Sequence, residues 1–238
     1  MKKLLAIATL AFVFLTACQK NNLPASPATK ILPLGASRVQ GDPPNYHSYR
    51  CKLWKKLVEN DWSVDFVGSQ IDPKSYALVD NEEFDPHHEG HSGYTSGQLL
   101  DELDDWMAGV DTPDIVLFSS PGGNDALDLL PYDDAVDNIV AIVQKLQVYN
   151  PNVTVVIEKM APGNAIAMLV LDDYYTRIQS DMDSLVNYLN TPTSNVVSID
   201  MATGFDADLL ADPVHYNQQG ASFISARYYD LLITLIQP

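Results

Sequence analysis

Four short blocks along the chain carry side chains that could do chemistry together. A serine lies at position 37, Gly93 and Asn124 follow in two later segments, and Asp212 stands three residues before His215. A serine hydroxyl becomes a strong nucleophile when an imidazole takes its proton and a carboxylate orients that imidazole. Backbone and amide N–H groups can hold the oxyanion that forms during acyl transfer. The set indicates a serine hydrolase, with Ser37, Asp212 and His215 as catalytic residues and Ser37, Gly93 and Asn124 as the oxyanion hole.

Asp212 and His215 form the most specific of these blocks. At a separation of three residues in a turn, the carboxylate can bond one imidazole nitrogen and leave the other facing the serine. Each block also has a plainer explanation: an Asp-Pro turn beside an exposed histidine, a turn serine, a loop glycine and an asparagine N-cap. The occurrence of all four blocks in one chain favours the catalytic explanation.

The predicted secondary structure brings these blocks to one edge of a sheet. Short apolar runs predict strands at 30–34, 63–67, 114–118, 153–158 and 195–199. Amphipathic stretches predict helices at 46–59, 96–107, 132–149, 172–189 and 218–236. This alternation predicts a doubly wound α/β domain with a parallel sheet. Ser37 follows the first strand, Asn124 the third and His215 the last, and sites in such sheets form outside the carboxyl ends of the strands.

The order of the blocks resembles the SGNH, or GDSL-type, hydrolase superfamily. The serine, glycine, asparagine and histidine of that pattern correspond to Ser37, Gly93, Asn124 and His215. The resemblance implies a single flavodoxin-like domain of three layers, with a five-stranded parallel sheet. It also implies that no cofactor or metal is needed.

Further runs resemble the carbohydrate esterase branch that includes the family 3 acetyl xylan esterases. These runs are Tyr49-Arg50 with Leu53-Trp54, residues 64–69, and residues 88–93. The resemblance implies deacetylation of a glycan. It makes three aromatic residues candidates for contact with a sugar: Tyr94, Phe205 and Tyr216.

The nucleophile block departs from the superfamily pattern. Ala36 stands where the family has an aspartate, so an acceptor that could brace the nucleophile loop is missing. Arg38 and Val39 replace the usual apolar and hydroxyl residues. We expect a working esterase that is slow or narrow in its substrates.

The N-terminus has the pattern of an export signal. Two lysines precede an apolar run at 4–15, which is shorter than the roughly 20 residues of a spanning helix. The ending Leu-Thr-Ala-Cys resembles a bacterial lipoprotein signal, which implies removal of residues 1–17 and attachment of lipid, palmitate included, to Cys18. Gln19 after that cysteine favours the outer membrane of a Gram-negative bacterium, and an ordinary signal peptide is the alternative. We expect residues 18–30 to form a flexible tether and residues 31–238 to form the hydrolase domain.

Composition excludes several other functions. With 14 basic and 31 acidic residues the net charge is −17, so we expect no nucleic acid partner. If Cys18 carries lipid, Cys51 has no disulfide partner and is expected to be a small buried hydrophobe. His88 and His91 have the wrong spacing for the zinc motif His-Glu-x-x-His, so no metal site is expected.

The sequence therefore predicts a lipid-anchored serine esterase that acts on O-acyl, preferably O-acetyl, esters of a carbohydrate. A lysophospholipase or thioesterase of the same superfamily is the alternative among hydrolases. A non-catalytic surface lipoprotein that binds glycan is the alternative outside the hydrolases.

Overall fold

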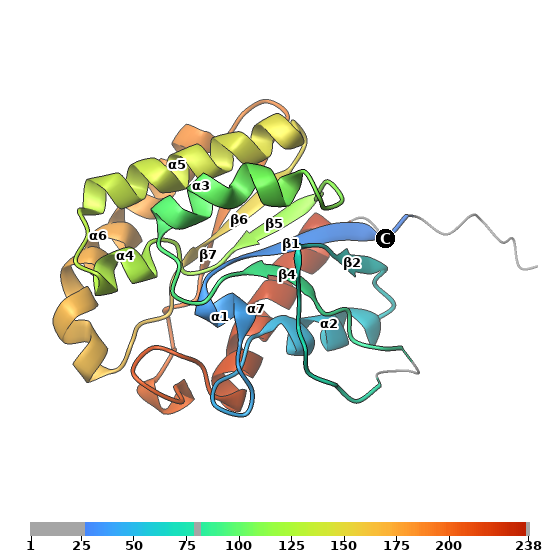
Figure 1. The fold of residues 1–238 in the computed structure, drawn as a ribbon, viewed down its shortest axis with the longest axis horizontal. Helices are drawn as coiled ribbons and strands as arrows, with labels where there is room; N and C mark the ends of the chain where they lie inside the picture. Colours follow the sequence, from blue (N-terminus) through green and yellow to red (C-terminus); the bar gives the residue numbers. More distant parts are fainter. Residues whose placement is uncertain (1–26, 79–81, 237–238) are drawn as a thin grey trace, which may run out of the picture.

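A computed structural model describes residues 27–78 and 82–236 of the chain. The predicted signal peptide, the lipidation site at Cys18 and residues 18–26 of the predicted tether lie outside these residues. The described part is a three-layer α/β domain (Figure 1). None of its helices is both long enough and apolar enough to cross a bilayer.

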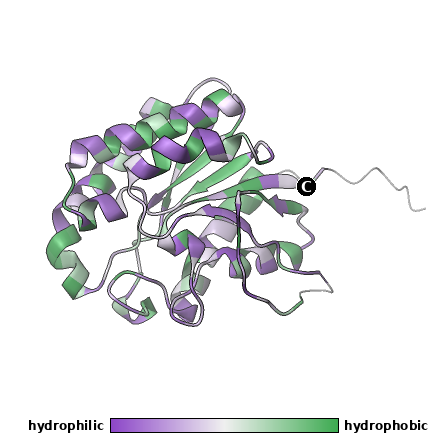
Figure 2. Cartoon of the chain, in the orientation of Figure 1, coloured by the Kyte–Doolittle hydropathy of each residue, from purple (hydrophilic) through white to green (hydrophobic). Residues whose placement is uncertain are grey.

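Four parallel strands form the centre of the sheet, in the order β1 (Thr29–Gly35), β5 (Ile115–Phe118), β6 (Thr154–Lys159) and β7 (Asn195–Asp200). Their runs of Ile, Leu and Val are buried on both faces, as expected for parallel strands covered by helices (Figure 2). The first strand begins at Thr29, one residue before the strand predicted at 30–34, so the ordered domain takes in the last two residues of the expected tether, 18–30.

Two short strands share the outer edge of β1. Strand β2 (Val64–Phe66) pairs with the start of β1 and β4 (His87–Gly90) with its end. Both lie opposite β5, because β1 pairs with β5 along its other edge. The parallel part thus has five positions, as expected, with one position divided between β2 and β4. The two-residue strand β3 (Gln70–Ile71) extends the sheet antiparallel to β4.

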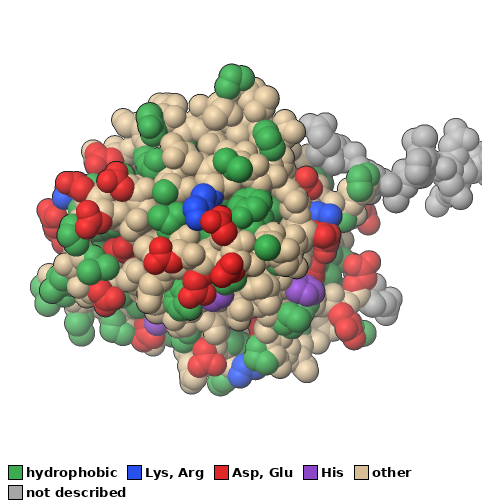
Figure 3. Space-filling view, turned by 45° about the horizontal axis from the view of Figure 1, so that its top comes forward, with side chains coloured by type: hydrophobic (Ala, Val, Ile, Leu, Met, Phe, Trp, Pro, Cys, Tyr) green, Lys and Arg blue, Asp and Glu red, His purple; other side chains and the backbone are tan. Residues whose placement is uncertain are grey.

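Helices cover both faces of this sheet. On one face lie α3 (Ser96–Met107), α5 (Tyr132–Tyr149) and α6 (Ala165–Leu189), and on the other α2 (Arg50–Val58) and α7 (Gln218–Leu235) (Figure 1). Each group closes its own apolar core against the sheet. The surface is acidic, and the face in Figure 3 carries many more carboxylates than basic side chains.

The predicted bounds of α3 and α5 are confirmed, whereas two other helices differ. The helix predicted at 46–59 begins only at Arg50, because residues 42–46 form a turn closed by pairing of Asp42 with Tyr46. The helix predicted at 172–189 begins at Ala165, where Asn164 caps it by accepting from two backbone N–H groups. Its first turns expose apolar side chains, so the hydrophobic period did not reveal them.

Short elements that the sequence did not reveal sit at the carboxyl ends of the strands. Helix α1 (Ser37–Gln40) follows β1, helix α4 (Gly123–Leu127) follows β5, and a 3-10 turn at Ala207–Leu209 follows β7 (Figure 1). These elements are too short for periodicity to show, and they carry or flank the candidate catalytic blocks.

Candidate active site

His215 joins the other two proposed members of a catalytic triad. Its Nε2 lies 2.8 Å from Ser37 Oγ, and its Nδ1 lies 2.7 Å from Asp212 Oδ2. Ser37 opens α1 directly after the central strand, whereas Asp212 and His215 lie in the loop before α7. The fold therefore brings together side chains that are 178 residues apart in the chain.

The loop of Asp212 fixes the orientation of the imidazole. Asp212 Oδ1 accepts from the backbone N–H groups of Val214, at 2.9 Å, and His215, at 2.8 Å. Partial burial acts to raise the pKa of Asp212, but these bonds and the imidazole contact outweigh it and hold the pKa below its ordinary value. The carboxylate stays ionised and accepts from Nδ1–H, which leaves Nε2 free to take the serine proton.

Tyr46 supports the imidazole from the side. The two rings stack with centroids 4.1 Å apart and planes inclined by 20°. Tyr46 comes from the turn at 42–46, far from His215 in the chain. No motif marked this residue, and only the fold shows that it limits the motion of the ring.

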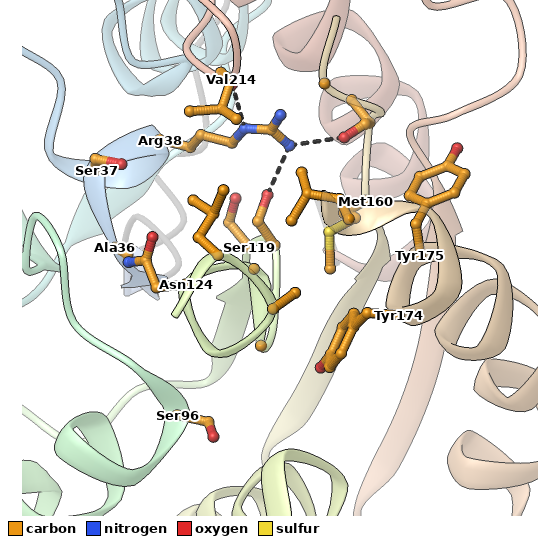
Figure 4. A pocket seen from close by; sticks show the side chains of 18 of the residues that line it. Ala36, Ser37, Arg38, Ser96, Ser119, Asn124, Met160, Tyr174, Tyr175 and Val214 are labelled. Carbon is orange, nitrogen blue, oxygen red and sulfur yellow. Dashed lines mark hydrogen bonds between the residues drawn. The ribbon is translucent and has the colours of Figure 1, made fainter. Parts of the chain in front are cut away.

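The three candidate oxyanion donors come from three separate segments of the chain. The backbone N–H groups of Ser37 and Gly93 bond to no acceptor within the described residues. Gly93 has a φ of +83° and open space where a side chain would lie, so its N–H can be approached closely. Asn124 donates one amide hydrogen to Tyr94 O at 2.8 Å, which leaves the second for a ligand. Ser37 and Asn124 line one pocket, from α1 and α4 respectively (Figure 4).

A buried carboxylate ties the Gly93 loop to the Asn124 helix. Asp125 accepts from the N–H of Ser96 at 2.8 Å and from its hydroxyl at 2.6 Å. Ser96 is the first residue of α3, three residues after Gly93. The two candidate donors that come from different loops are therefore held to each other by a charge-assisted pair of bonds.

Arg38 links the nucleophile to the neighbouring loops. Its guanidinium is nearly buried and donates to Val214 O and Ala161 O, each at 2.8 Å, and to Ser120 Oγ at 3.2 Å. Figure 4 shows it spanning the space between these loops. The residue noted in the sequence as a departure from the family pattern thus connects Ser37 to the histidine loop and to the loops after β5 and β6.

Glu158 bonds to Ser120, a residue just after β5 that also accepts from Arg38. This fully buried carboxylate accepts from the N–H of Ser120 at 2.7 Å and from the hydroxyls of Ser119 at 3.0 Å and Tyr228 at 2.8 Å. Burial raises the pKa of Glu158, although the hydrogen bond from Tyr228 and the positive charge of Arg38 act to lower it. Ser120 has a φ of +48°, which the bond to its N–H helps to hold. The one sequence signal for this role is an acidic residue at the end of an otherwise apolar strand.

The three aromatic candidates have different environments. Tyr94 is partly exposed beside Asn124 and lines the pocket. Tyr216 is fully buried, packed beneath the Arg38 guanidinium at 4.8 Å, so its assignment as a sugar-facing residue is wrong. Phe205 is half-buried and packs edge-on against Tyr216 and Phe223. Core packing accounts for Tyr216, and no feature of the sequence distinguishes it from Tyr94.

Cys51 is half-buried on α2 and forms no disulfide within the described residues. Burial raises the pKa of its thiol, which disfavours the thiolate. Across residues 27–78 and 82–236 no three His, Cys, Asp or Glu side chains come together as a metal site.

The pocket at Ser37 has mostly apolar walls away from the reacting groups. Leu99, Met160, Leu171 and Tyr174 line it, from α3, the end of β6 and α6 (Figure 4). At its edge, Gly122 leaves no room for a side chain, because a Cβ there would lie 1.6 Å from the Tyr174 hydroxyl. An apolar group bound at Ser37 would be shielded from water here.

Similarity of this chain to known proteins is found among solved structures. No family model matches the chain, and no curated protein is significantly similar to it. Among solved structures, a carbohydrate esterase family 3 protein from Talaromyces cellulolyticus is 28% identical, with a TM-score of 0.75 over 87% of this chain and 97% of that one. An acetyl esterase mutant with acetate ion gives the same values.

More distant structures share the fold. A family 3 carbohydrate esterase from Clostridium thermocellum is 24% identical, with a TM-score of 0.71 over 88% of this chain and all of that one. TesA is 15% identical, with a TM-score of 0.61 over 87% of this chain. The chain therefore has the SGNH hydrolase fold, and the solved structures that it resembles include esterases and acylhydrolases of that fold.

Proposed function

We propose that the protein is a serine esterase that removes O-acyl groups, preferably O-acetyl groups, from a carbohydrate. The observation that carries this proposal is the unbroken contact from Ser37 Oγ through His215 to Asp212, at 2.8 and 2.7 Å. The likeness to family 3 carbohydrate esterases supports the substrate class.

In the first half of the reaction, Ser37 Oγ attacks the ester carbonyl while His215 Nε2 takes its proton. Asp212 stabilises the imidazolium that results. The N–H groups of Ser37, Gly93 and Asn124 hold the oxyanion of the tetrahedral intermediate. As the intermediate collapses, Nε2–H protonates the leaving alcohol, and the acyl group remains on Ser37.

In the second half, a water molecule attacks the acyl-serine carbonyl. His215 takes a proton from that water and returns it to Ser37 Oγ as the carboxylic acid leaves. The same donors hold the second oxyanion. No cofactor enters either half, and each proton that His215 accepts is released in the following step.

Because the pocket wall is apolar, an enzyme that acts on esters of longer acyl chains is the second candidate function. Leu99 and Leu171 could contact an acyl chain beyond acetyl, as a lysophospholipase or thioesterase requires. The third possibility, a glycan binder without catalysis, does not account for an ionised carboxylate, an oriented imidazole and a serine in contact.

We also propose that the enzyme is exported and held at the cell envelope through lipid on Cys18, in the outer membrane of a Gram-negative bacterium. The signal-like residues 1–17 and Gln19 support this location. Expression of Cys18→Ala beside the wild type tests it. The wild type is expected in the membrane fraction and the variant in the soluble fraction. The same distribution of both proteins between the two fractions would contradict the lipid anchor.

Acetate release from a panel of acetylated polysaccharides, with p-nitrophenyl esters of increasing acyl length in parallel, tests the activity. Wild type is expected to release acetate and Ser37→Ala to release none above background. Ser222→Ala, which removes a hydroxyl bonded only within α7, is the matched control and should keep full activity. Activity that survives in Ser37→Ala contradicts the proposal, and a preference for long acyl esters over acetate favours the second candidate.

A further inference from the structure

A second hollow lies beside Tyr46, the residue that stacks on His215, and differs in character from the apolar pocket. It has a volume of about 340 Å³, within the range of small-molecule sites, and polar side chains line much of it. We propose that this hollow binds the carbohydrate half of the ester through the sugar hydroxyl groups. The inference rests on the proposed esterase function and specifies where the alcohol side of the substrate lies.

Residues that line the hollow also contact residues of the proposed active site. Tyr46 lines it and stacks on the imidazole of His215. Gln40 also lines the hollow, and it is the last residue of α1, the helix that begins at Ser37. Gln40 Oε1 accepts from the N–H of Ser92 at 2.7 Å, next to Gly93 of the candidate oxyanion hole. Because His215 protonates the departing alcohol, that alcohol lies beside the imidazole, and a sugar there can extend past Tyr46 into the hollow.

His88 supplies a hydrogen-bond donor that the described residues leave unused. The side chain is 3% exposed and lines the hollow. Its Nδ1 accepts from the N–H of Gly90 at 2.9 Å, and burial lowers its pKa to about 2, so the neutral ring carries its hydrogen on Nε2. Nε2 bonds to no group among residues 27–78 and 82–236, although it is not sealed in the core. Water, or a ligand hydroxyl that displaces it from the hollow, can therefore accept from Nε2–H.

The position of His88 is fixed by its surroundings. The backbone of Gly68 packs on it so closely that a Cβ at Gly68 would lie 2.2 Å from the His88 carbonyl carbon. The bond from Gly90 to Nδ1 and the burial of the ring hold the imidazole in place before a ligand arrives, so binding does not cost the entropy of ordering it.

The charges of the hollow favour a neutral polyol. Asp42 and Lys74 on its rim form a loose pair at 3.9 Å, and Asp72 is neutralised by the buried Arg50 at 3.2 Å. No excess positive charge remains to hold a phosphate or a uronate. Sugar hydroxyls both donate and accept, so they can take the His88 donor and the Gln40 amide while donating to Asp42.

The test compares two substrates that share the acyl group. The first is the acetylated polysaccharide from which the protein releases acetate fastest, and the second is p-nitrophenyl acetate, which has no sugar. In His88→Asn the asparagine oxygen can still accept from Gly90, whereas the Nε2 donor is lost. The ratio of kcat/KM on the polysaccharide to kcat/KM on p-nitrophenyl acetate is expected to fall roughly tenfold.

A matched control and a second variant keep the test decisive. His47→Asn makes the same change at a neighbouring histidine outside this hollow and should leave the ratio as in wild type. Gln70→Trp, at an exposed lining residue, fills the hollow without disturbing the core and should lower the ratio at least as much. The inference is overturned if the ratio is unchanged in both His88→Asn and Gln70→Trp. This would be so if kcat/KM fell equally for the two substrates, or fell for neither.

Direct binding separates this inference from the esterase proposal. Deacetylated oligosaccharide from the same polysaccharide is titrated into Ser37→Ala, with the histidine side chains observed by NMR. A shift of the His88 Nε2 resonance that follows saturation is expected, and no shift at millimolar sugar counts against the site. If wild type hydrolyses neither substrate, the esterase proposal fails, and the titration still reports on the hollow.

Discussion

The proposed catalytic groups and the groups that hold them occupy different environments. The side chains of Asp212 and His215 are 41% and 21% exposed, whereas Arg38 is 9% exposed and Glu158 is fully buried. The exposed group is small: in the proposed mechanism Ser37 and His215 exchange the protons, and Asp212 orients the imidazole. The buried group is larger and connects the ends of several strands. This contrast implies that changes in the exposed group alter rate with little effect on stability, while changes in the buried group alter both.

Removal of the oxyanion amide should give the largest effect on rate alone. Asn124→Ala is expected to lower kcat roughly 100- to 1,000-fold with little change in KM, since the donor acts on charge that develops during reaction. Steady-state kinetics on p-nitrophenyl acetate measure this. Thermal unfolding of the same variant should stay close to that of wild type, apart from the lost bond to Tyr94 O.

Removal of Arg38 should affect both properties. Arg38→Ala leaves buried acceptors on Ala161 and Val214 unpaired and leaves Glu158 without a nearby cation. The free energy of unfolding is expected to fall by about 3 kcal/mol or more, and kcat roughly 10- to 100-fold as the loops shift. Denaturant unfolding and steady-state kinetics provide the two measurements.

The control for this prediction is an arginine on the surface. Arg177→Ala removes an exposed pair with Asp133 and the stacking of the guanidinium on the Tyr132 ring at 3.7 Å, and should change the unfolding free energy by about 1 kcal/mol or less. If Arg38→Ala were as mild as this control, the proposed difference between the two groups would not hold.

The acid side of the stability profile tests the exposed group. The folded-state pKa of Asp212 lies below its ordinary value, so the carboxylate stabilises the fold above that value and its contribution is lost as pH falls through the folded pKa. The stability difference between wild type and Asp212→Asn should be constant above about pH 5 and should shrink below about pH 3.8. Urea unfolding at each pH measures it, and a difference independent of pH would contradict the assignment.

The smallest effect is expected at Ala36, where the chain departs from the family pattern. Arg38 already ties the nucleophile segment to three other loops, so an added carboxylate has little left to brace. Ala36→Asp is expected to change kcat/KM by less than about threefold. A manyfold rise would mean instead that the loop is poorly held in the present chain, and a manyfold fall would mean that it is adapted to alanine.

The sequence predicted the exposed group and most of the framework, but not the buried group. Ser37, Asp212 and His215 carry their chemistry in their side chains and lie in short local motifs, so residue type and order were enough. Apolar strands and long amphipathic helices also show in the pattern of hydrophobic residues. Strand β4 did not, because His87–Gly90 contains no apolar run, and it takes its place only by pairing with β1 and β3.

The roles of Arg38, Glu158 and Tyr46 depend on contacts between distant segments. A buried arginine beside the nucleophile and an acid at the end of an apolar strand look like exceptions to a pattern until the fold places them together. Tyr216 shows the converse error, because the family resemblance made it a candidate for contact with a sugar, whereas the fold buries it. Burial of a single aromatic residue cannot be assigned from the neighbouring residues alone.

Covalent labelling tests the central claim most directly. A fluorophosphonate probe reacts with a serine only when a neighbouring base activates it. Peptide mapping of labelled protein is predicted to place the adduct on Ser37, with labelling abolished in Ser37→Ala and strongly slowed in His215→Ala. A folded wild-type protein that takes no label, or that takes it at another serine, would contradict the account.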